Sequence, residues 1–247
     1  MCDWLYNMAH IENLVKKDLK SLNGQVIKDD YLLSKNKDFF RLSGVQVFCG
    51  RQGQGKTISM VKVLLDIKKR YPKCIVVTNL LLNVDFDYIQ FSSMDELADK
   101  LTSVNNGIYG VVYVIDEIHT YFNALDSKNI PSYIFTEISQ QRKQRKLILG
   151  TSQLYLRLAK PFREQSDTLI MCKCILQKFN IMYVFDGATL VEDFGKLSGD
   201  LLKVGFFMQT RKLRDSYDTY QKVVSGREEY ETQNNFNFEI NKKFLKK

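Results

Sequence analysis

The chain has 247 residues, of which 45% are hydrophobic and 26% are charged. This length and composition are typical of a globular protein with one large domain or two small ones, and they exclude disorder, collagen-like repeats and disulfide-stabilised miniproteins as the main state. The apolar runs are far shorter than the roughly 18 residues of a membrane-spanning helix, and residues 1–20 lack the apolar stretch of a signal peptide. We therefore expect a cytoplasmic protein with no transmembrane segment of its own.

The net charge of +8 is concentrated in one part of the chain. Nine basic and two acidic residues lie between positions 140 and 178, which accounts for nearly all of the excess. Such a concentration is typical of a surface that binds a polyanion. A solvated basic face without a partner is the alternative.

The five cysteines are expected to be reduced thiols. Cys172 and Cys174 are two residues apart, so on a strand both side chains would share one face. A structural zinc site needs about four ligands, and His10 and His119 lie far from this pair in the sequence. A zinc site is therefore the weaker interpretation.

Taken in chain order, residues 1–42 are expected to form a helical segment, because residues 11, 14, 15 and 19 place apolar side chains on one helical face. From residue 44 onward, short β-rich runs alternate with helical periods. We expect strands at 45–49, 74–78, 111–115 and 147–150, and helices at 58–71, 97–101 and 133–144. This alternation predicts an α/β fold with a mostly parallel central sheet.

After residue 169 the pattern changes to that of antiparallel strands. Residues 169–176 and 181–186 are expected to form a hairpin, and 204–209 a further strand, as a C-terminal antiparallel extension of the sheet. The polar segment 226–247 is expected to be a tail. The predicted organisation is therefore a helical segment at 1–42, one domain at 43–225 and a tail at 226–247.

The strongest motif begins where the first predicted strand ends. Residues 50–57 read GRQGQGKT and match G-x-x-x-x-G-K-S/T, directly before a predicted helix. Glycines let the backbone wrap around phosphates, whose charge is attracted by the amides and the helix N-terminus. Lys56 would reach the β- and γ-phosphates and Thr57 would hold Mg²⁺, so ATP and Mg²⁺ are the expected cofactors. The expected nucleotide-binding residues are Gly50, Gly53, Gln54, Gly55, Lys56 and Thr57.

Two adjacent acids follow the predicted strand at 111–115. Asp116 ends a buried strand, where P-loop folds hold the metal. Glu117 would act as the general base that activates a water molecule. The alternative for Glu117 is a solvated residue at a helix start. His119 is a candidate γ-phosphate sensor, although a polar residue at a helix start is the preferred interpretation.

Two further groups of polar residues flank the last predicted parallel strand. Gln153, in the string Thr151-Ser152-Gln153, would sense the γ-phosphate or orient the water, because ligands bind at the carboxyl ends of parallel strands. A simple turn is the alternative. Before the strand lie Arg142, Lys143, Arg145 and Lys146. One of them could be an arginine finger for a neighbouring subunit and others could contact DNA, whereas the alternative is a solvated helix end.

These motifs together resemble the FtsK/HerA superfamily of P-loop ATPases, and within it the zonular-occludens-toxin-like and phage genome-packaging ATPases. The resemblance is carried by the motif at 50–57, by Val77-Thr78-Asn79-Leu80, by Ile115-Asp116-Glu117-Ile118-His119, and by Ile138-Ser139-Gln140-Gln141-Arg142 with Gln153 eleven residues later. It covers residues 44–165 well and 166–222 loosely. The resemblance implies a P-loop ATPase domain of the additional-strand, catalytic-glutamate type at 43–225, with Arg142 as the finger, Gln153 as the sensor and a ring, commonly hexameric.

The leading hypothesis is an ATPase ring that pumps double-stranded DNA into a viral capsid. Such a protein would work in the host cytoplasm or on the virion, with a capsid vertex or portal protein as a further candidate partner. Its DNA contacts would be sequence-independent and salt-sensitive. The candidate DNA-binding residues are Lys143, Arg145, Lys146, Arg157, Lys160 and Arg163.

Other functions remain open at this point. Toxin-like phage assembly proteins carry a transmembrane helix after the ATPase domain, and this sequence shows none, which favours packaging over an extrusion ATPase that works through a membrane partner. A nucleotide-dependent switch or loader would not need Glu117. A small-molecule kinase would leave the basic stretch unexplained, and a structural protein would leave the P-loop unused.

Overall fold

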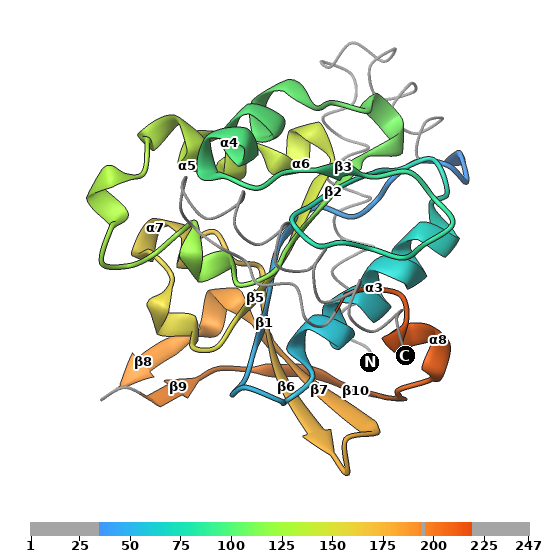
Figure 1. The fold of residues 1–247 in the computed structure, drawn as a ribbon. Coiled ribbons are helices and arrows are strands. Elements are labelled where there is room, and N and C mark those ends of the chain that lie inside the picture. The colour runs from blue at the N-terminus through green and yellow to red at the C-terminus, as the bar shows by residue number, and fades with distance from the viewer. Residues whose placement is uncertain (1–34, 194–195, 219–247) are drawn as a thin grey trace, which may run out of the picture.

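The computed structural model of the chain describes residues 35–193 and 196–218, and the fold is built on one sheet of eight strands in the order β10-β7-β6-β1-β5-β4-β2-β3 (Figure 1). The strands from β6 to β3 in this order are parallel, and β7 and β10 are antiparallel. Their bounds are β1 (Gly44–Cys49), β2 (Ile75–Thr78), β3 (Ile89–Gln90), β4 (Val111–Ile115), β5 (Lys146–Ser152), β6 (Thr168–Ile175), β7 (Phe179–Asp186) and β10 (Leu201–Met208). The predicted mostly parallel sheet with a C-terminal antiparallel extension is confirmed.

Helices cover both faces of the sheet, and a separate two-stranded ribbon pairs β8 (Val191–Asp193) with β9 (Lys196–Ser198). The α-helices are α3 (Lys56–Arg70), α4 (Met94–Ser103), α5 (Ser132–Ser139), α6 (Gln141–Gln144), α7 (Lys160–Arg163) and α8 (Arg211–Arg214). Short 3₁₀ turns are η1 (Gly107–Tyr109), η2 (Ile118–Thr120), η3 (Ser127–Asn129), η4 (Tyr155–Arg157) and η5 (Gly187–Thr189).

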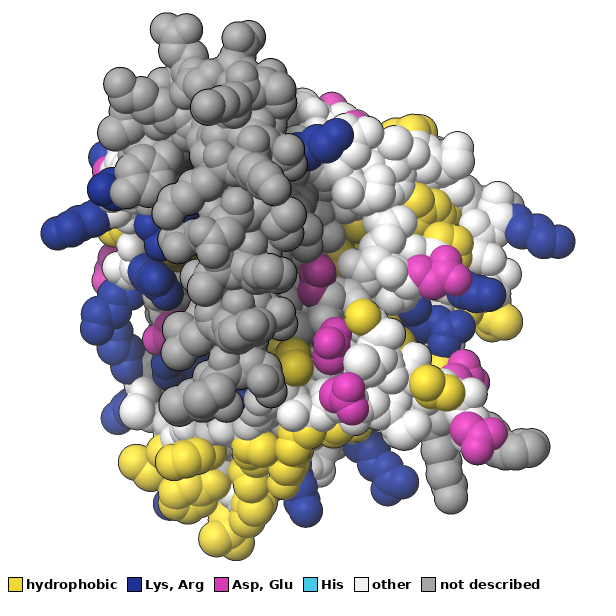
Figure 2. All heavy atoms as spheres, turned by 180° about the vertical axis from the view of Figure 1, so that it is seen from behind, with side chains coloured by type: hydrophobic (Ala, Val, Ile, Leu, Met, Phe, Trp, Pro, Cys, Tyr) yellow, Lys and Arg dark blue, Asp and Glu magenta, His cyan; other side chains and the backbone are white. Residues whose placement is uncertain are grey.

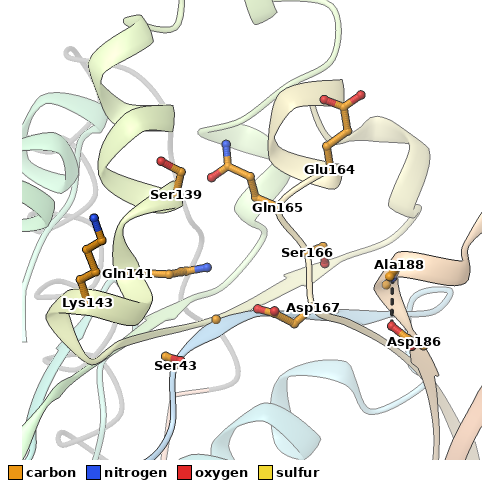
Figure 3. A pocket seen from close by; sticks show the side chains of 12 residues that line it. Ser43, Ser139, Gln141, Lys143, Glu164, Gln165, Ser166, Asp167, Asp186 and Ala188 are labelled. Atoms are coloured by element: carbon orange, nitrogen blue, oxygen red, sulfur yellow. Dashed lines mark hydrogen bonds between the residues drawn. The ribbon is translucent and has the colours of Figure 1, made fainter. Parts of the chain in front are cut away.

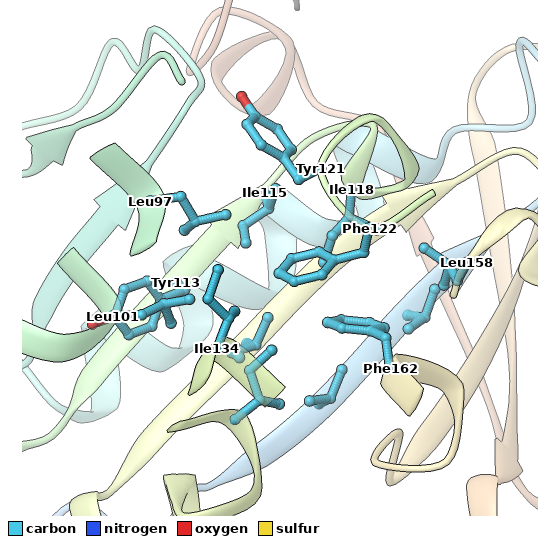
Figure 4. Close-up of a cluster of buried hydrophobic side chains, with 14 of the residues drawn as sticks. Leu97, Leu101, Tyr113, Ile115, Ile118, Tyr121, Phe122, Ile134, Leu158 and Phe162 are labelled. Atoms are coloured by element: carbon cyan, nitrogen blue, oxygen red, sulfur yellow. The ribbon is translucent and has the colours of Figure 1, made fainter. Parts of the chain in front are cut away.

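Two apolar clusters hold these layers together. On one face α3 and α8 pack against the sheet through side chains such as Leu64 and Leu213. On the other face α4, α5 and α7 contribute Leu97, Ile134 and Phe162 (Figure 4). All five residues of β4 are buried, which is why that strand reads as a continuous apolar run in the sequence.

The structure shifts several predicted boundaries. The helix expected at 133–144 is two helices that break at Gln140, because Ile134 and Ile138 anchor the first part to the core and the next apolar residue is Leu147. The strand expected at 147–150 is the middle of the longer β5 (Lys146–Ser152). The strand expected at 204–209 is β10, which begins earlier, at Leu201, and ends at Met208. Nearly all of segment 1–42 and the whole tail at 226–247 lie outside the described residues.

Membrane-spanning helices are absent from the part of the chain that the structure describes: no helix there is both long enough and apolar enough to cross a bilayer.

Candidate nucleotide-binding site

The loop between β1 and α3 has the backbone shape of a phosphate cradle. Gly53 and Gly55 have φ angles of 76° and 73°, in the left-handed region that favours glycine. A Cβ atom on Gly55 would overlap the Asn180 amide, whereas one on Gly53 would meet no atom within 4 Å. Gly53 is therefore required by its backbone angle alone, and Gly55 by its angle and by the lack of space.

The N-terminus of α3 is left open to an anion. Gly55 is its N-cap residue, no side chain caps it, and its first turn contains no acidic residue. The free N–H groups and the helix dipole therefore face the loop without a competing carboxylate. Lys56, the first residue of α3, is buried and its Nζ donates to the Arg51 carbonyl at 3.4 Å, across the loop.

Asp116 lies where three parallel strands end. Thr57 Oγ1 donates to Asp116 Oδ1 at 2.9 Å, and Thr151 Oγ1 donates to the same oxygen at 2.7 Å. The Asn79 side chain holds the backbone of Asp116, since its Nδ2 donates to the Asp116 carbonyl at 3.0 Å and its Oδ1 accepts from the Asp116 N–H at 2.8 Å. The carboxylate and the Thr57 hydroxyl are thus held side by side.

Glu117 adopts a strained conformation next to this pair. Its φ and ψ are 50° and 47°, which is unusual for a residue with a side chain. Its N–H donates to Thr151 Oγ1 at 2.9 Å. Burial, with the charge of Asp116 as a second cause, raises the pKa of the Glu117 carboxyl, while Lys56, a hydrogen bond from Gln153 and the charge of Arg157 oppose the rise.

His119 contacts the same acid. Its Nδ1 lies 3.2 Å from Glu117 Oε2 and 3.4 Å from Ser152 Oγ. Burial lowers the pKa of the imidazole, and the positive charges of Arg157 and Lys56 lower it further. Glu117 Oε2 has no hydrogen-bond partner among the described residues, so His119 lies against the carboxylate without a hydrogen bond to it.

The residues present fit a magnesium nucleotide. Mg²⁺ prefers oxygen ligands, and Thr57 and Asp116 offer a hydroxyl and a carboxylate that already share a hydrogen bond. The uncapped end of α3, the two left-handed glycines and Lys56 suit the phosphates. Glu117 stands beside these groups as an acid whose pKa is raised, which suits it to take up a proton.

The structure brings most of the predicted site residues to one edge of the sheet. The loop of Gly50, Gly53, Gln54 and Gly55 with Lys56 and Thr57 lies beside Asp116 and Glu117, and Gln153 hydrogen-bonds to Glu117. Arg142 is not there. It lies in α6, before β5, and a seven-residue strand at about 3.3 Å per residue separates it from this edge.

The candidate DNA-binding residues do not form one exposed surface. Lys146 is wrong as a DNA contact, because its side chain is 2% exposed and its Nζ donates to the carbonyl of Leu101 inside the core. Arg145 stacks over the Phe39 ring at 4.6 Å, and Arg163 lies 3.3 Å from Glu192. Lys143, Arg157 and Lys160 are exposed, and the charge of Arg157 acts on both Glu117 and His119.

The extension supplies contacts to the loop that the sequence did not reveal. The side chain of Asn180, in β7, donates to the Gly55 carbonyl and to Ser59 Oγ, both at 3.1 Å. Gln209 Nε2 donates to Asn180 Oδ1 at 2.6 Å. Gln54, in the loop itself, makes a further contact to the neighbouring strand β6: its Oε1 accepts from the N–H of Cys174 at 3.1 Å.

No protein-family profile and no curated protein sequence matches this chain. Among solved structures, the N-terminal domain of zonular occludens toxin from Neisseria meningitidis aligns with a TM-score of 0.52 at 16% identity, covering 72% of this chain and 100% of that domain. The genome packaging NTPase B204 from Sulfolobus turreted icosahedral virus 2 aligns at 0.46 and 15%, covering 58% and 92%. The DNA-packaging ATPase B204 from Sulfolobus turreted icosahedral virus aligns at 0.47 and 11%, covering 65% and 98%. The first alignment shows a shared fold: this chain has the α/β P-loop fold of the zonular occludens toxin domain.

Proposed function

We propose that this protein is a magnesium-dependent ATPase that moves double-stranded DNA, as the motor of viral genome packaging. The observation that carries the proposal is the arrangement of Glu117, which stands with a raised pKa beside the Thr57–Asp116 pair at the open end of α3. A protein that only binds nucleotide has no need of a second acid at this position.

Binding and positioning follow from the residues of the loop. Backbone N–H groups at the start of α3 and the ammonium of Lys56 would bind the phosphates of ATP. Thr57 and Asp116 would hold Mg²⁺, which neutralises phosphate charge when bound. Asn79 and Thr151 keep Asp116 in place through its backbone and its Oδ1.

Hydrolysis would depend on Glu117 as the base that takes a proton from the attacking water. The hydrogen bond from Gln153 would orient this carboxylate, and His119 lies beside it. The strained backbone at Glu117 is fixed by its N–H bond to Thr151, so the carboxylate is positioned before substrate binds.

The coupling to DNA and the ring are the finer parts of the proposal. Arg142 lies at the far edge of the sheet from its own loop, which supports a role for it in the site of a neighbouring subunit. Exposed Lys160, which lies 3.8 Å from Glu164, would offer a contact to DNA phosphates. A capsid vertex or portal protein would be the docking partner of such a motor.

The test is steady-state ATP hydrolysis by the full chain, with and without long linear duplex DNA. We expect stimulation by DNA, and we expect Glu117→Gln to lower kcat by about 10² to 10⁴ while still binding nucleotide. Lys160→Glu tests the DNA coupling separately from the chemistry: it should weaken the stimulation by DNA and leave basal hydrolysis unchanged.

Each other result assigns a different function. Hydrolysis that ignores DNA would contradict translocation and favour an assembly or extrusion ATPase that works through a membrane partner. Tight binding without hydrolysis under any condition would favour a switch or loader. Full activity of Glu117→Gln would exclude this residue as the base.

A further inference from the structure

Within the described residues, the three strands β6, β7 and β10 share one face with several exposed apolar side chains. In register across these strands, Val204 lies opposite Tyr183, which lies opposite Met171, and the next rows join Phe206 to Ile181 and Met208 to Phe179. Figure 2 shows apolar side chains gathered at this end of the molecule. The exposed members are Met171, Ile175, Phe179, Val204, Phe206 and Met208, with Phe206 exposed to 85%. We call this surface the extension face.

The opposite side of the same strands grips the phosphate loop. Asn180 is fully buried and bonds to Gly55 and Ser59, and its neighbours in β7, Phe179 and Ile181, belong to the extension face. One layer of sheet therefore separates the extension face from the nucleotide site. A molecule that docks on the extension face would therefore lie next to the edge of the sheet that carries the candidate nucleotide site.

The extension face has positive charge and no acid. Lys173 lies in the middle of it, in register with Ile181, and Lys178 lies in the hairpin turn. Residues 168–185 and 201–208 contain no aspartate or glutamate. A complementary surface therefore needs carboxylates.

Such a surface lies at the other end of the sheet. A pocket of about 520 Å³ opens where β1 and β6 begin and β7 ends, and its carboxylates come from Glu164, Asp167 and Asp186, with Lys143 as the one cation among its described lining residues (Figure 3). Gln141 also lines it, is only 7% exposed, and its Oε1 has no hydrogen-bond partner within the described residues. We call this surface the acidic pocket.

The two surfaces cannot meet within one chain. The acidic pocket lies at the start of β1 and the phosphate loop follows its end, so the whole length of the strand separates them. A contact between two extension faces related by a two-fold axis would bring lysines together without any acid. The complementary pair instead fits a head-to-tail contact, which closes a ring if the rotation permits.

We propose that the extension face of one copy docks on the acidic-pocket edge of the next copy, with Lys173 and Lys178 facing Glu164, Asp167 and Asp186. This inference deepens the proposed function and rests on it in one respect: the contact carries α6, with Arg142, toward the nucleotide edge of the neighbour. The acidic pocket itself needs no nucleotide to receive a lysine, so the contact can be measured without hydrolysis.

The experiment uses sedimentation velocity of the full chain over a range of concentrations, with and without a non-hydrolysable ATP analogue. We expect the wild type to self-associate, more weakly at high salt. The face variant Lys173→Glu/Lys178→Glu and the pocket variant Glu164→Lys should each lose self-association by at least about tenfold, as expected when close charge pairs across an interface are reversed. Their 1:1 mixture should regain association, at least as a dimer, because the intact extension face of the pocket variant then meets the intact acidic pocket of the face variant.

A second comparison tests the apolar part. Phe206→Ser should weaken association by about tenfold or more, as for a buried aromatic anchor of an interface, whereas Leu125→Ser, which removes an equally exposed apolar residue (91%) outside both surfaces, should not. Phe206 and Leu125 project into solvent, so both variants should fold.

Three outcomes would overturn the inference. These are a wild type that stays monomeric under all conditions, a face variant that loses association while the pocket variant keeps it, and a mixture that fails to recover. Hydrolysis is assayed separately, so a protein that hydrolyses ATP yet associates through another surface loses this inference and keeps the proposed function. A protein that associates as described yet never hydrolyses ATP would keep this inference and lose the proposed function.

Discussion

At the scale of single residues, the site depends on an amide that holds another residue's backbone. Asn79 binds both the N–H and the carbonyl of Asp116 from the end of the neighbouring strand β2. Because Asp116 is held at its backbone, its side chain is free to contact Thr57 and Thr151. The string Val77-Thr78-Asn79-Leu80 marks this residue in the sequence, but only the sheet order shows what it contacts.

Asn79→Ala should therefore affect stability and binding together. We expect the free energy of unfolding to fall by about 1–3 kcal/mol, since two backbone groups lose their partner, and the affinity for magnesium nucleotide to fall about tenfold. Urea denaturation and equilibrium titration measure the two effects. Asn106→Ala is the control: it loses bonds to the Lys73 and Gly110 carbonyls far from the site, so only stability should change. Unchanged nucleotide affinity in Asn79→Ala would contradict this role.

How far single residues could be predicted depends on the sequence distance of their partners. Two short motifs predict four of the site residues, because residues adjacent in each motif are also adjacent in the site. These are Lys56 and Thr57 in one motif and Asp116 and Glu117 in the other. Asn180 is separated from Gly55 by 125 residues, and its local sequence is that of an ordinary hairpin strand. Lys146 was misplaced for the related reason that only the packed core shows its ammonium bonded to a carbonyl of α4.

At the scale of elements, the loop between β1 and α3 contains two glycines with the same backbone angle and different surroundings. Gly53→Ala should cost about 1–2 kcal/mol, the strain of a left-handed residue with a side chain. Gly55→Ala should cost more, because its Cβ would overlap the Asn180 amide that grips the loop. Nucleotide affinity should follow the same order.

Chemical denaturation and nucleotide titration of the two variants provide the check. The two glycines have φ angles of 76° and 73°, so they form a matched pair in which the surroundings are the variable. Equal losses in both variants would show that the grip of Asn180 has no effect on the loop.

The elements were predictable where an apolar period is continuous. The run at 111–115 is buried on both faces and is a strand, as its composition predicts. Residues Ser93-Met94-Asp95-Glu96 form the start of α4, where Ser93 Oγ accepts from the N–H of Glu96 at 3.2 Å as an N-cap. The single helix predicted at 133–144 is wrong at Gln140, where the structure has a break. The second half of this segment is polar and has no apolar residue facing the core. Helical propensity alone therefore could not show the break.

At the scale of the whole molecule, bound nucleotide should stabilise the fold by mass action. A ligand at about 100 times its Kd adds about 2.7 kcal/mol to the free energy of unfolding if it binds only the native state. The site joins β1, β4, β5 and α3, so its ligand should stabilise the central sheet as a unit. Thermal unfolding with and without magnesium and an ATP analogue measures the shift.

Lys56→Ala should remove most of this shift, because it deletes the ammonium at the phosphate cradle. Lys69→Ala, on the last turn of the same helix, is exposed and should leave the shift intact. A full shift in Lys56→Ala would place the nucleotide elsewhere.

The fold class was predictable because alternation of strand and helix permits few arrangements. The strand order was not, since β1 pairs with β5 and β6, which follow it by about a hundred residues or more. The ribbon of β8 and β9 gave no signal, because its strands have three residues each and exposed side chains in β8.

The grip on the phosphate loop has a consequence for how the chain is made. Asn180 and Gln209 leave the ribosome long after the loop that they hold, and β1 gains its neighbour β6 at the same late stage. A nascent chain that has emerged as far as β5 thus contains the motifs for phosphate and metal but not the side chains that fix the loop. Under the proposed function, tight nucleotide binding and the first turnover would therefore begin only after β7 and β10 have been made.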